Sequence, residues 1–217
     1  MKKKLIAIVA IFAMIAVMAG CSSKESEYPV LEDAKEPTAA EEVSFNGFTG
    51  SYDTDKWVFD NSMGNFAIYD KAIYMSGNPD GQCPNVNANI SQDFEGKLTE
   101  DDMNSLMDEL KNMGIDGFTV VKNEMRTFNG EPVIYYETKT EITDDMIDLL
   151  IENGNMTEAD IDAMGGRDRL KEVGETDSIG IAAVIDGKIV IVTGTYYDDS
   201  ADVLEAMKLL LKTGKVS

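Results

Sequence analysis

Two strands near the C-terminal end limit the fold of this chain most strongly. The stretches Ser178–Ile185 and Lys188–Tyr197 predict strands, and Asp186-Gly187 between them is typical of a two-residue turn with positive φ at both positions. Apolar side chains occupy both faces of both strands, namely Ile179, Ile181, Val184, Ile185, Ile189, Val190, Ile191 and Val192. Because a strand that is apolar on both faces has to be covered on both faces, we expect helices on each side of this sheet.

A second hairpin is predicted upstream, where Asn129-Gly130 joins the stretches Gly117–Phe128 and Glu131–Ile142. Short aromatic and β-branched runs predict further strands. These are Val43–Tyr52, which has a Gly-containing break, and Lys56–Asp60, Phe66–Tyr69, Ala72–Met75 and Val86–Phe94. The sequence therefore predicts an α+β fold with a central, mainly antiparallel sheet flanked by helices.

Helices are predicted where a capping residue precedes apolar side chains at helical spacing. Thr99 is a good N-cap for a helix that ends at Gly114. The other expected helices are a pair, Asp144–Glu152 and Glu158–Met164, and a last helix over Ser200–Lys212. A charged loop, Arg167–Thr176, is expected after the pair. We expect the segment 143–175 to be a helical-pair insertion beside the sheet.

The N-terminal stretch Met1–Cys21 predicts export and a lipid anchor. Lys2–Lys4 precede an apolar run, Leu5–Ala19, and small residues follow, as in a secretory signal. A cysteine directly after the expected cleavage site makes the stretch resemble a bacterial lipoprotein signal, whose lipobox is Met18, Ala19, Gly20 and Cys21. The resemblance implies cleavage before Cys21 and attachment of lipid, including an acyl group such as palmitate, to that cysteine.

The same stretch is shorter than a membrane span. Its apolar run of 15 residues falls below the roughly 20 that cross a bilayer, and a retained anchor helix is the alternative. We therefore expect the mature chain to lie outside the cytoplasm, with the cell membrane as its partner through lipid on Cys21.

Three parts of the chain are expected. Residues 1–20 form the signal that is removed, and residues 43–217 form a single domain. Residues 21–42 comprise the lipidated cysteine and a flexible acidic linker, because Glu, Ser, Ala and Pro dominate this segment and large apolar residues are few. An edge strand around Tyr28–Leu31 is the alternative for part of the linker.

Composition excludes several classes of function. The chain has no histidine, which excludes His-dependent nucleophiles and His-ligated zinc. Loss of the signal lysines changes the net charge from −21 to −24, which argues against a nucleic-acid partner. With Cys21 lipidated, Cys83 is left without a disulfide partner and is expected to be buried and unreactive. Asp53 and Asp55 begin like a calcium loop, but the required Gly and Glu do not follow. We expect no metal and no cofactor.

The order of elements resembles a known family. An aromatic strand start, Ser51–Trp57, comes first, and an Asn-containing strand, Val86–Ser91, leads into the amphipathic helix, the two hairpins and the terminal helix. This order, over about Phe45–Lys212, is similar to the PsbP-type α/β/α sandwich of the photosystem II extrinsic protein P, a eukaryotic Ran-binding factor and many bacterial lipoproteins. The resemblance implies an antiparallel sheet between helices and a non-enzymatic accessory role, and it assigns no functional residue. A cystatin-like or NTF2-like fold is the alternative.

Five aromatic residues are the candidate lining of a ligand cleft, namely Trp57, Tyr135, Tyr136, Tyr196 and Tyr197. Neighbouring tyrosines in a strand point to opposite faces, so one of each pair is expected to face the cleft, and ordinary strand packing is the alternative. No catalytic motif is present. The expected function is therefore a non-enzymatic binding or accessory role toward an envelope protein or a small ligand. A carboxylate-based or divalent-cation-dependent enzyme and a structural spacer are the alternatives.

Overall fold

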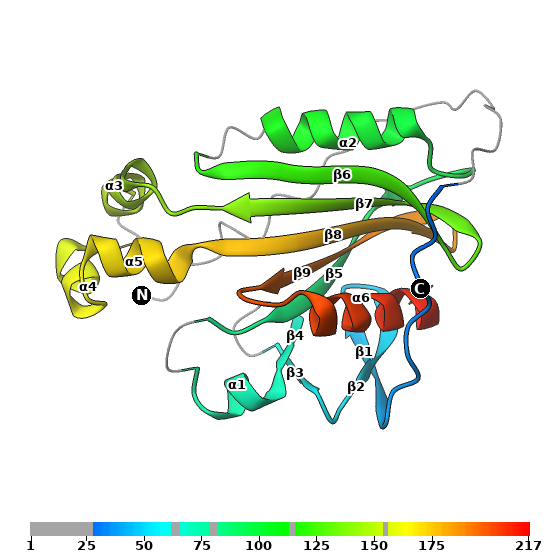
Figure 1. The fold of residues 1–217 in the computed structure, drawn as a ribbon, viewed down its shortest axis with the longest axis horizontal. Helices are drawn as coiled ribbons and strands as arrows, with labels where there is room; N and C mark the ends of the chain where they lie inside the picture. The colour runs from blue at the N-terminus through cyan, green and yellow to red at the C-terminus, as the bar shows by residue number, and fades with distance from the viewer. Residues whose placement is uncertain (1–27, 62–65, 79–81, 113–115, 154–155) are drawn as a thin grey trace.

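The computed structural model describes residues 28–61, 66–78, 82–112, 116–153 and 156–217 (Figure 1). The lipobox residues Met18, Ala19, Gly20 and Cys21 and the expected helix end at Gly114 lie outside these ranges. Within the ranges, no helix combines the length and apolar character that a membrane span requires.

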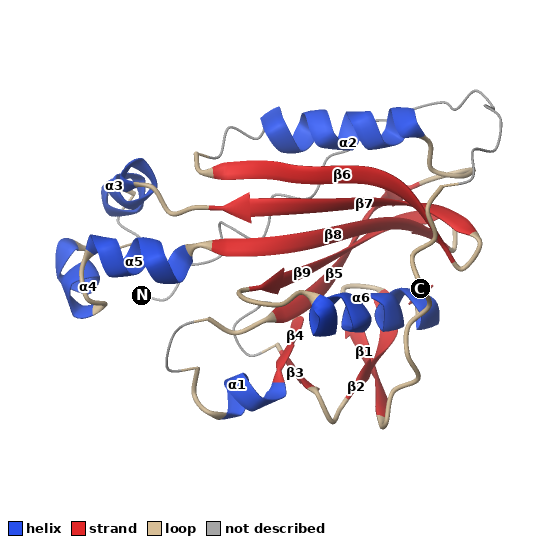
Figure 2. Ribbon diagram, in the orientation of Figure 1, coloured by secondary structure: helices blue, strands red, loops and turns tan. Residues whose placement is uncertain are grey.

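Among the described residues, seven antiparallel strands form the main sheet in the order β3-β4-β5-β9-β8-β7-β6 (Figure 2). These strands are β3 (Trp57–Asp60), β4 (Ala67–Asp70), β5 (Asn85–Asp93), β6 (Phe118–Phe128), β7 (Glu131–Thr140), β8 (Thr176–Ile185) and β9 (Lys188–Tyr196). Asn129-Gly130 joins β6 to β7 and Asp186-Gly187 joins β8 to β9, and all four turn residues have positive φ. Both predicted hairpins are confirmed.

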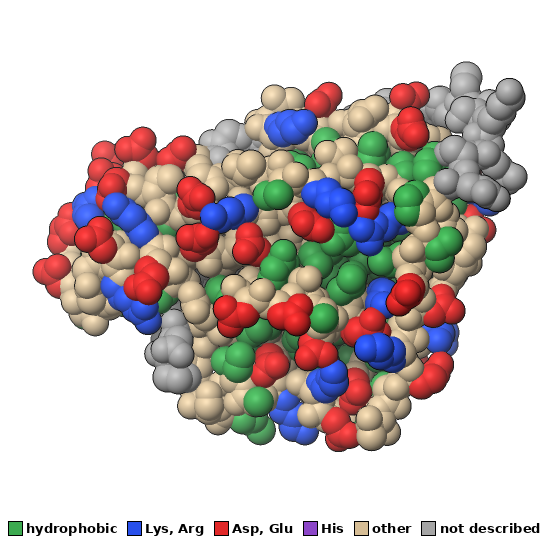
Figure 3. Space-filling model, viewed as in Figure 1, with side chains coloured by type: hydrophobic (Ala, Val, Ile, Leu, Met, Phe, Trp, Pro, Cys, Tyr) green, Lys and Arg blue, Asp and Glu red, His purple; other side chains and the backbone are tan. Residues whose placement is uncertain are grey.

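A smaller sheet and six helices complete the described part of the chain. The smaller sheet has the order β1-β2-β10, with β1 (Ala40–Phe45), β2 (Phe48–Asp53) and β10 (Lys215–Val216). The helices are α1 (Lys71–Met75), α2 (Glu100–Asn112), α3 (Asp144–Glu152), α4 (Glu158–Ala163), α5 (Arg167–Gly174) and α6 (Ala201–Thr213). Helices α3, α4 and α5 gather at one end of the long hairpin strands, where acidic side chains dominate the surface (Figures 1 and 3).

Strands β8 and β9 are covered on both faces, as their apolar sequences predict. On one face, α6 and the smaller sheet enclose a hydrophobic cluster that includes Ile181 and Met207, both inaccessible to solvent. On the other face, α2 packs over a second cluster that includes Ile191 and Leu106. The predicted α+β class, with an antiparallel sheet flanked by helices, is therefore confirmed.

Two segments before β5 differ from the predicted strands. The stretch predicted as one strand, Val43–Tyr52, is a hairpin, because Asn46 and Gly47 adopt positive φ between β1 and β2. The predicted strand Ala72–Met75 is the short helix α1. This helix forms because Asp70 is its N-cap and accepts a hydrogen bond from the Ile73 amide at 2.9 Å.

The predicted charged loop Arg167–Thr176 is wrong over most of its length, because residues 167–174 form α5. Arg167, at the start of α5, lies 2.7 Å from a carboxylate oxygen of Asp148 and 2.8 Å from one of Glu158. These contacts connect α5 to α3 and α4. The insertion therefore contains three helices held by a shared guanidinium, where the sequence predicts two helices and a loop.

Part of the expected linker packs against the domain. The Leu31 amide donates to the Thr127 carbonyl at 2.8 Å, and the Thr127 amide donates to the Pro29 carbonyl at 2.9 Å. Val30 thereby forms a parallel bridge to Thr127, which agrees with the alternative of an edge strand at this place. Residues 28–42 therefore pack as part of the domain, which corrects the expected flexible linker 21–42 over this part.

Helix α6 holds the same segment through a buried lysine. The Nζ atom of Lys208 lies 2.5 Å from Glu205 Oε1 and donates to the Asp33 carbonyl at 3.4 Å, and only 4% of the residue is exposed. Glu205 also accepts from the Lys35 amide at 3.0 Å. Burial alone would raise the pKa of Glu205, but the Lys208 ammonium and the Lys35 amide hold that pKa below its usual value.

Candidate functional site

The structure separates the five aromatic residues of the predicted cleft. Trp57 and Tyr135 are buried in the cluster under α6, and the half-buried Tyr196 packs against the same cluster. Tyr136 belongs to the cluster under α2, on the opposite face of the sheet. Tyr197 lies outside both clusters and lines a cavity. The five side chains therefore do not share one cleft, and among them Tyr197 is the one at a cavity wall.

Tyr135 is a packing residue with charged neighbours. The Arg126 guanidinium lies 3.9 Å from the centre of its ring, and its hydroxyl donates to Glu137 Oε1 at 2.7 Å. Burial, and then the Glu137 carboxylate, raise the pKa of Tyr135 far above its ordinary value. The hydroxyl therefore keeps its proton across the physiological range.

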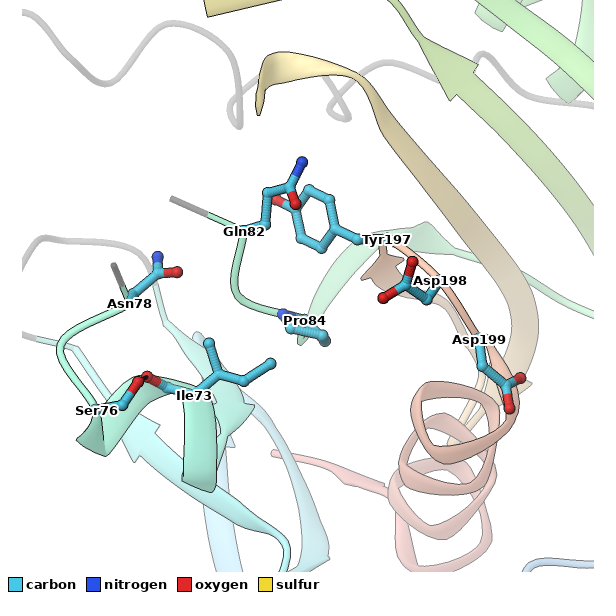
Figure 4. A pocket seen from close by; sticks show the side chains of 8 residues that line it. All are labelled: Ile73, Ser76, Asn78, Gln82, Pro84, Tyr197, Asp198 and Asp199. Atoms are coloured by element: carbon cyan, nitrogen blue, oxygen red, sulfur yellow. Dashed lines mark hydrogen bonds between the residues drawn. The ribbon is translucent and has the colours of Figure 1, made fainter. Parts of the chain in front are cut away.

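The cavity lies between three segments that are distant in the sequence (Figure 4). It has a volume of about 340 Å³. Its lining residues are Ile73, Ser76, Asn78, Gln82, Pro84, Tyr197, Asp198 and Asp199. They come from α1 and the turn after it, from the residues before and at the start of β5, and from the loop between β9 and α6.

The first wall is set by the turn that ends α1. Ser76 Oγ donates to the Ile73 carbonyl at 2.7 Å, and the backbone amide of Asn78 donates to the same carbonyl at 3.1 Å. Asn78 has φ 47°, a left-handed conformation that asparagine tolerates better than most residues. This turn places Asn78 in the wall of the cavity, and its buried Oδ1 atom has no hydrogen-bond partner within the described part of the chain.

The other two walls are held together by the pairing of β5 with β9. Asn85 pairs with Thr195, so the neighbouring Pro84 and Tyr197 lie at the same end of the sheet. Burial raises the pKa of Tyr197 above its ordinary value. Asp199 Oδ1 accepts a hydrogen bond from the Ala201 amide at 3.0 Å, at the beginning of α6.

The two aspartates of the loop have different positions. The Asp198 side chain points toward the cavity, whereas the Asp199 side chain points away from it toward α6 (Figure 4). Of these two aspartates, the exposed Asp198 carboxylate is therefore the one that faces a ligand. The described lining residues include no lysine or arginine.

A cysteine lies behind the cavity without forming a reactive centre. Cys83, between the lining residues Gln82 and Pro84, is buried, and its Sγ contacts the Asp70 carbonyl at 3.8 Å. Burial, and then the charge of Asp70, raise the pKa of its thiol to about 11. The thiol is therefore protonated near neutral pH. In the described ranges, no group of three or more Cys, Asp or Glu side chains is arranged to hold a metal ion.

Sequence reasoning found one of the eight lining residues, Tyr197. The sequence Asn78-Pro79-Asp80-Gly81 predicts a turn that begins at a lining residue, and its last three residues lie outside the described ranges. Asp198 and Asp199 stand before the predicted last helix, where capping of the helix start explains acidic residues, and the Asp199 hydrogen bond to the Ala201 amide agrees with that explanation. The remaining lining residues are ordinary in type and spacing.

Comparisons with known proteins concern the fold. No family model matches the chain, and no curated protein matches it. The solution structure of cyanobacterial PsbP (CyanoP) from Synechocystis sp. PCC 6803 is similar with a TM-score of 0.44 and 12% identity, covering 92% of this chain and 99% of that chain. The crystal structure of the Saccharomyces cerevisiae Ran-binding protein Mog1p is similar with a TM-score of 0.46 and 6% identity, covering 82% of this chain and 95% of that chain.

Proposed function

We propose that this chain is a lipid-anchored, extracytoplasmic binding module without catalytic function, and that it holds a small ligand in the cavity beside Tyr197. The cavity carries the proposal. Its volume of about 340 Å³ falls in the range of small-molecule sites, and its walls combine an aromatic ring with amide and carboxylate groups.

The proposed absence of catalysis is supported by the chemistry of the lining. The chain has no histidine to act as a general base, and the Cys83 thiol beside the cavity keeps its proton. Asp198 and Asp199 belong to one loop, and Asp199 is engaged at the start of α6. Among the described lining residues, no two carboxylates therefore face each other across a substrate, the arrangement that glycoside hydrolysis requires.

Binding at the cavity can be tested by ligand-induced stabilisation. We expect that a compound from a library of neutral, cationic and anionic small molecules raises the melting temperature of the mature chain in detergent, because a ligand of the native state stabilises it. Tyr197→Ala should abolish the shift, and Tyr196→Ala should keep it, since the Tyr196 ring does not line the cavity. A library that yields no stabilising compound, or shifts that survive Tyr197→Ala, would contradict the proposal.

The proposed anchor has a separate test. Cys21→Ala should move the chain from the membrane fraction to the soluble fraction, because it removes the atom that carries the lipid. Cys83→Ala is the matched control and should leave the chain in the membrane fraction. Retention of the Cys21→Ala chain in the membrane would show that the N-terminal stretch is a retained anchor helix.

A further inference from the structure

We infer that the cavity beside Tyr197 binds a primary ammonium group carried on a short aliphatic chain, an inference that rests on the proposed binding function. The inference specifies the chemical class of the ligand, whereas the shape of the cavity alone does not specify it.

The first argument is the unbalanced negative charge of the described lining. The Asp198 carboxylate only accepts hydrogen bonds, and the Gln82 carboxamide offers an acceptor oxygen beside its N–H donors. The Ser76 hydroxyl already donates to the Ile73 carbonyl, so its proton is engaged. An ammonium group offers three donors to these oxygens and brings the positive charge that pairs with the carboxylate.

The second argument is the position of the ring and the charge. Tyr197 and Asp198 are neighbours in the loop after β9, and both side chains are directed to the cavity (Figure 4). A cation is attracted to the face of an aromatic ring, and a carboxylate beside that ring strengthens the preference for positive charge. Among the described lining residues, no Lys or Arg supplies an ammonium or guanidinium that already fills this role.

The third argument concerns the rest of the ligand and its competitors. Ile73 and Pro84 give the cavity apolar wall that suits methylene groups. The net charge of −21 disfavours an anion in the same place. A neutral polyol could use the amide groups and donate to Asp198, but it would bring no positive charge to pair with that carboxylate.

The experiment is a titration of the isotope-labelled mature chain in detergent, followed by nuclear magnetic resonance. The probes are n-pentylamine, its neutral isostere 1-pentanol, and D-glucose as a polyol. We expect saturable shifts of the Asn78 and Gln82 side-chain amides with n-pentylamine in the millimolar range, and weaker or unsaturated shifts with the other two. Added salt should weaken the amine response, because it screens an exposed charge pair.

Variants separate a specific site from general attraction to an acidic chain. Asp198→Asn should reduce the affinity for n-pentylamine about threefold to fivefold, as for an exposed ion pair. Asp199→Asn removes the same charge one residue away and should leave the affinity within error, because that side chain points to α6. Tyr197→Phe should retain the amine response, whereas Tyr197→Leu should lose it, since the ring face supplies the attraction.

Each result bears on the ligand class. Equal binding of 1-pentanol, or equal losses in Asp198→Asn and Asp199→Asn, would overturn the ammonium assignment. Binding of glucose alone, lost in Tyr197→Leu, would also overturn it while leaving the proposed binding function intact. No response to any of the three probes would overturn the ammonium assignment as well, and the library screen would then decide the proposed function independently.

Discussion

Gly180 on β8 is expected to tolerate no side chain, because the ring of Tyr136 lies across it. Gly180 pairs with Tyr136 on β7 and with Thr193 on β9. A Cβ atom at Gly180 would overlap Cζ and Oη of Tyr136, well inside the 3.0 Å that real Cβ contacts keep. The φ of Gly180 is outside the left-handed region, so the space above it, not its backbone conformation, requires glycine.

The structure gives the size of the effect. Only 2% of Tyr136 is exposed, so the ring has no solvent-filled space in which to move, and Gly180→Ala would have to displace it by roughly 1 Å inside a close-packed cluster. Overpacking of this kind costs about 1–3 kcal/mol of unfolding free energy. We expect a loss of about 2 kcal/mol, which corresponds to roughly 4–8 °C in melting temperature for a chain of this size.

Urea unfolding followed by the fluorescence of Trp57, the single tryptophan, is the assay. In a Tyr136→Leu background, Gly180→Ala should cost less than about 0.5 kcal/mol, because the shorter side chain no longer covers the glycine. In a Tyr136→Phe background the full penalty should persist, since the ring remains. Equal penalties for Gly180→Ala in the Leu and Phe backgrounds would refute the reasoning, because the ring would then not be the cause.

Three further changes test other contacts. Lys208→Ala should lower the free energy of unfolding by about 1–3 kcal/mol and speed proteolysis within residues 28–36, because it leaves the partly buried Glu205 unpaired. The control Lys212→Ala removes an exposed pair and should lower it by less than about 1 kcal/mol. Native Cys83 should resist iodoacetamide at pH 8 and react after unfolding. The pKa of the Cys83 thiol is about 11 in the folded chain, above the ordinary value of 9.0. The contribution of the protonated thiol to stability is therefore complete below pH 9 and is lost as the pH rises through 11. Rapid alkylation of the native chain at pH 8 would contradict the burial of this thiol. Arg167→Gln should raise amide hydrogen exchange in α3–α5 and leave β8 and β9 protected; equal exchange throughout would show that the guanidinium does not hold the three helices together.

The hairpins were predictable because their signals are local. Asn129-Gly130 and Asp186-Gly187 adopt positive φ, and each pair is flanked by long strands whose alternation is clear. At Asn46-Gly47 the sequence predicts only a Gly-containing break in the stretch Val43–Tyr52. In the structure these two residues adopt positive φ and join two strands of six residues each. The turn signal was present there, but the prediction did not use it.

Two errors have causes that lie outside local propensity. The aromatic and β-branched composition of Ala72–Met75 favours a strand, yet the Asp70 carboxylate caps the segment as a helix. Residues 28–42 have the composition of a flexible linker, but Leu31 and Ala34 are buried against the domain. Two buried apolar residues and a few long-range hydrogen bonds are enough to order such a segment. The average composition of the segment does not reveal these contacts.

The candidate site was predictable only in part, because its walls come together through the pairing of β5 with β9. That pairing places residues near position 84 beside residues near position 197, a proximity that no local pattern encodes. Tyr197 was predicted because neighbouring tyrosines in a strand direct their rings to opposite faces, so that one of each pair was expected to line a cleft.

The sequence alone does not distinguish the roles of Asp198 and Asp199. Both residues precede a helix, both are exposed, and capping explains either of them equally well from the sequence. In the structure, Asp199 accepts the Ala201 amide and turns toward α6, which leaves Asp198 to face the cavity (Figure 4). The difference arises from the direction in which the chain leaves β9. Two residues of identical chemistry are thereby given different roles, and the same difference makes each the natural control for the other.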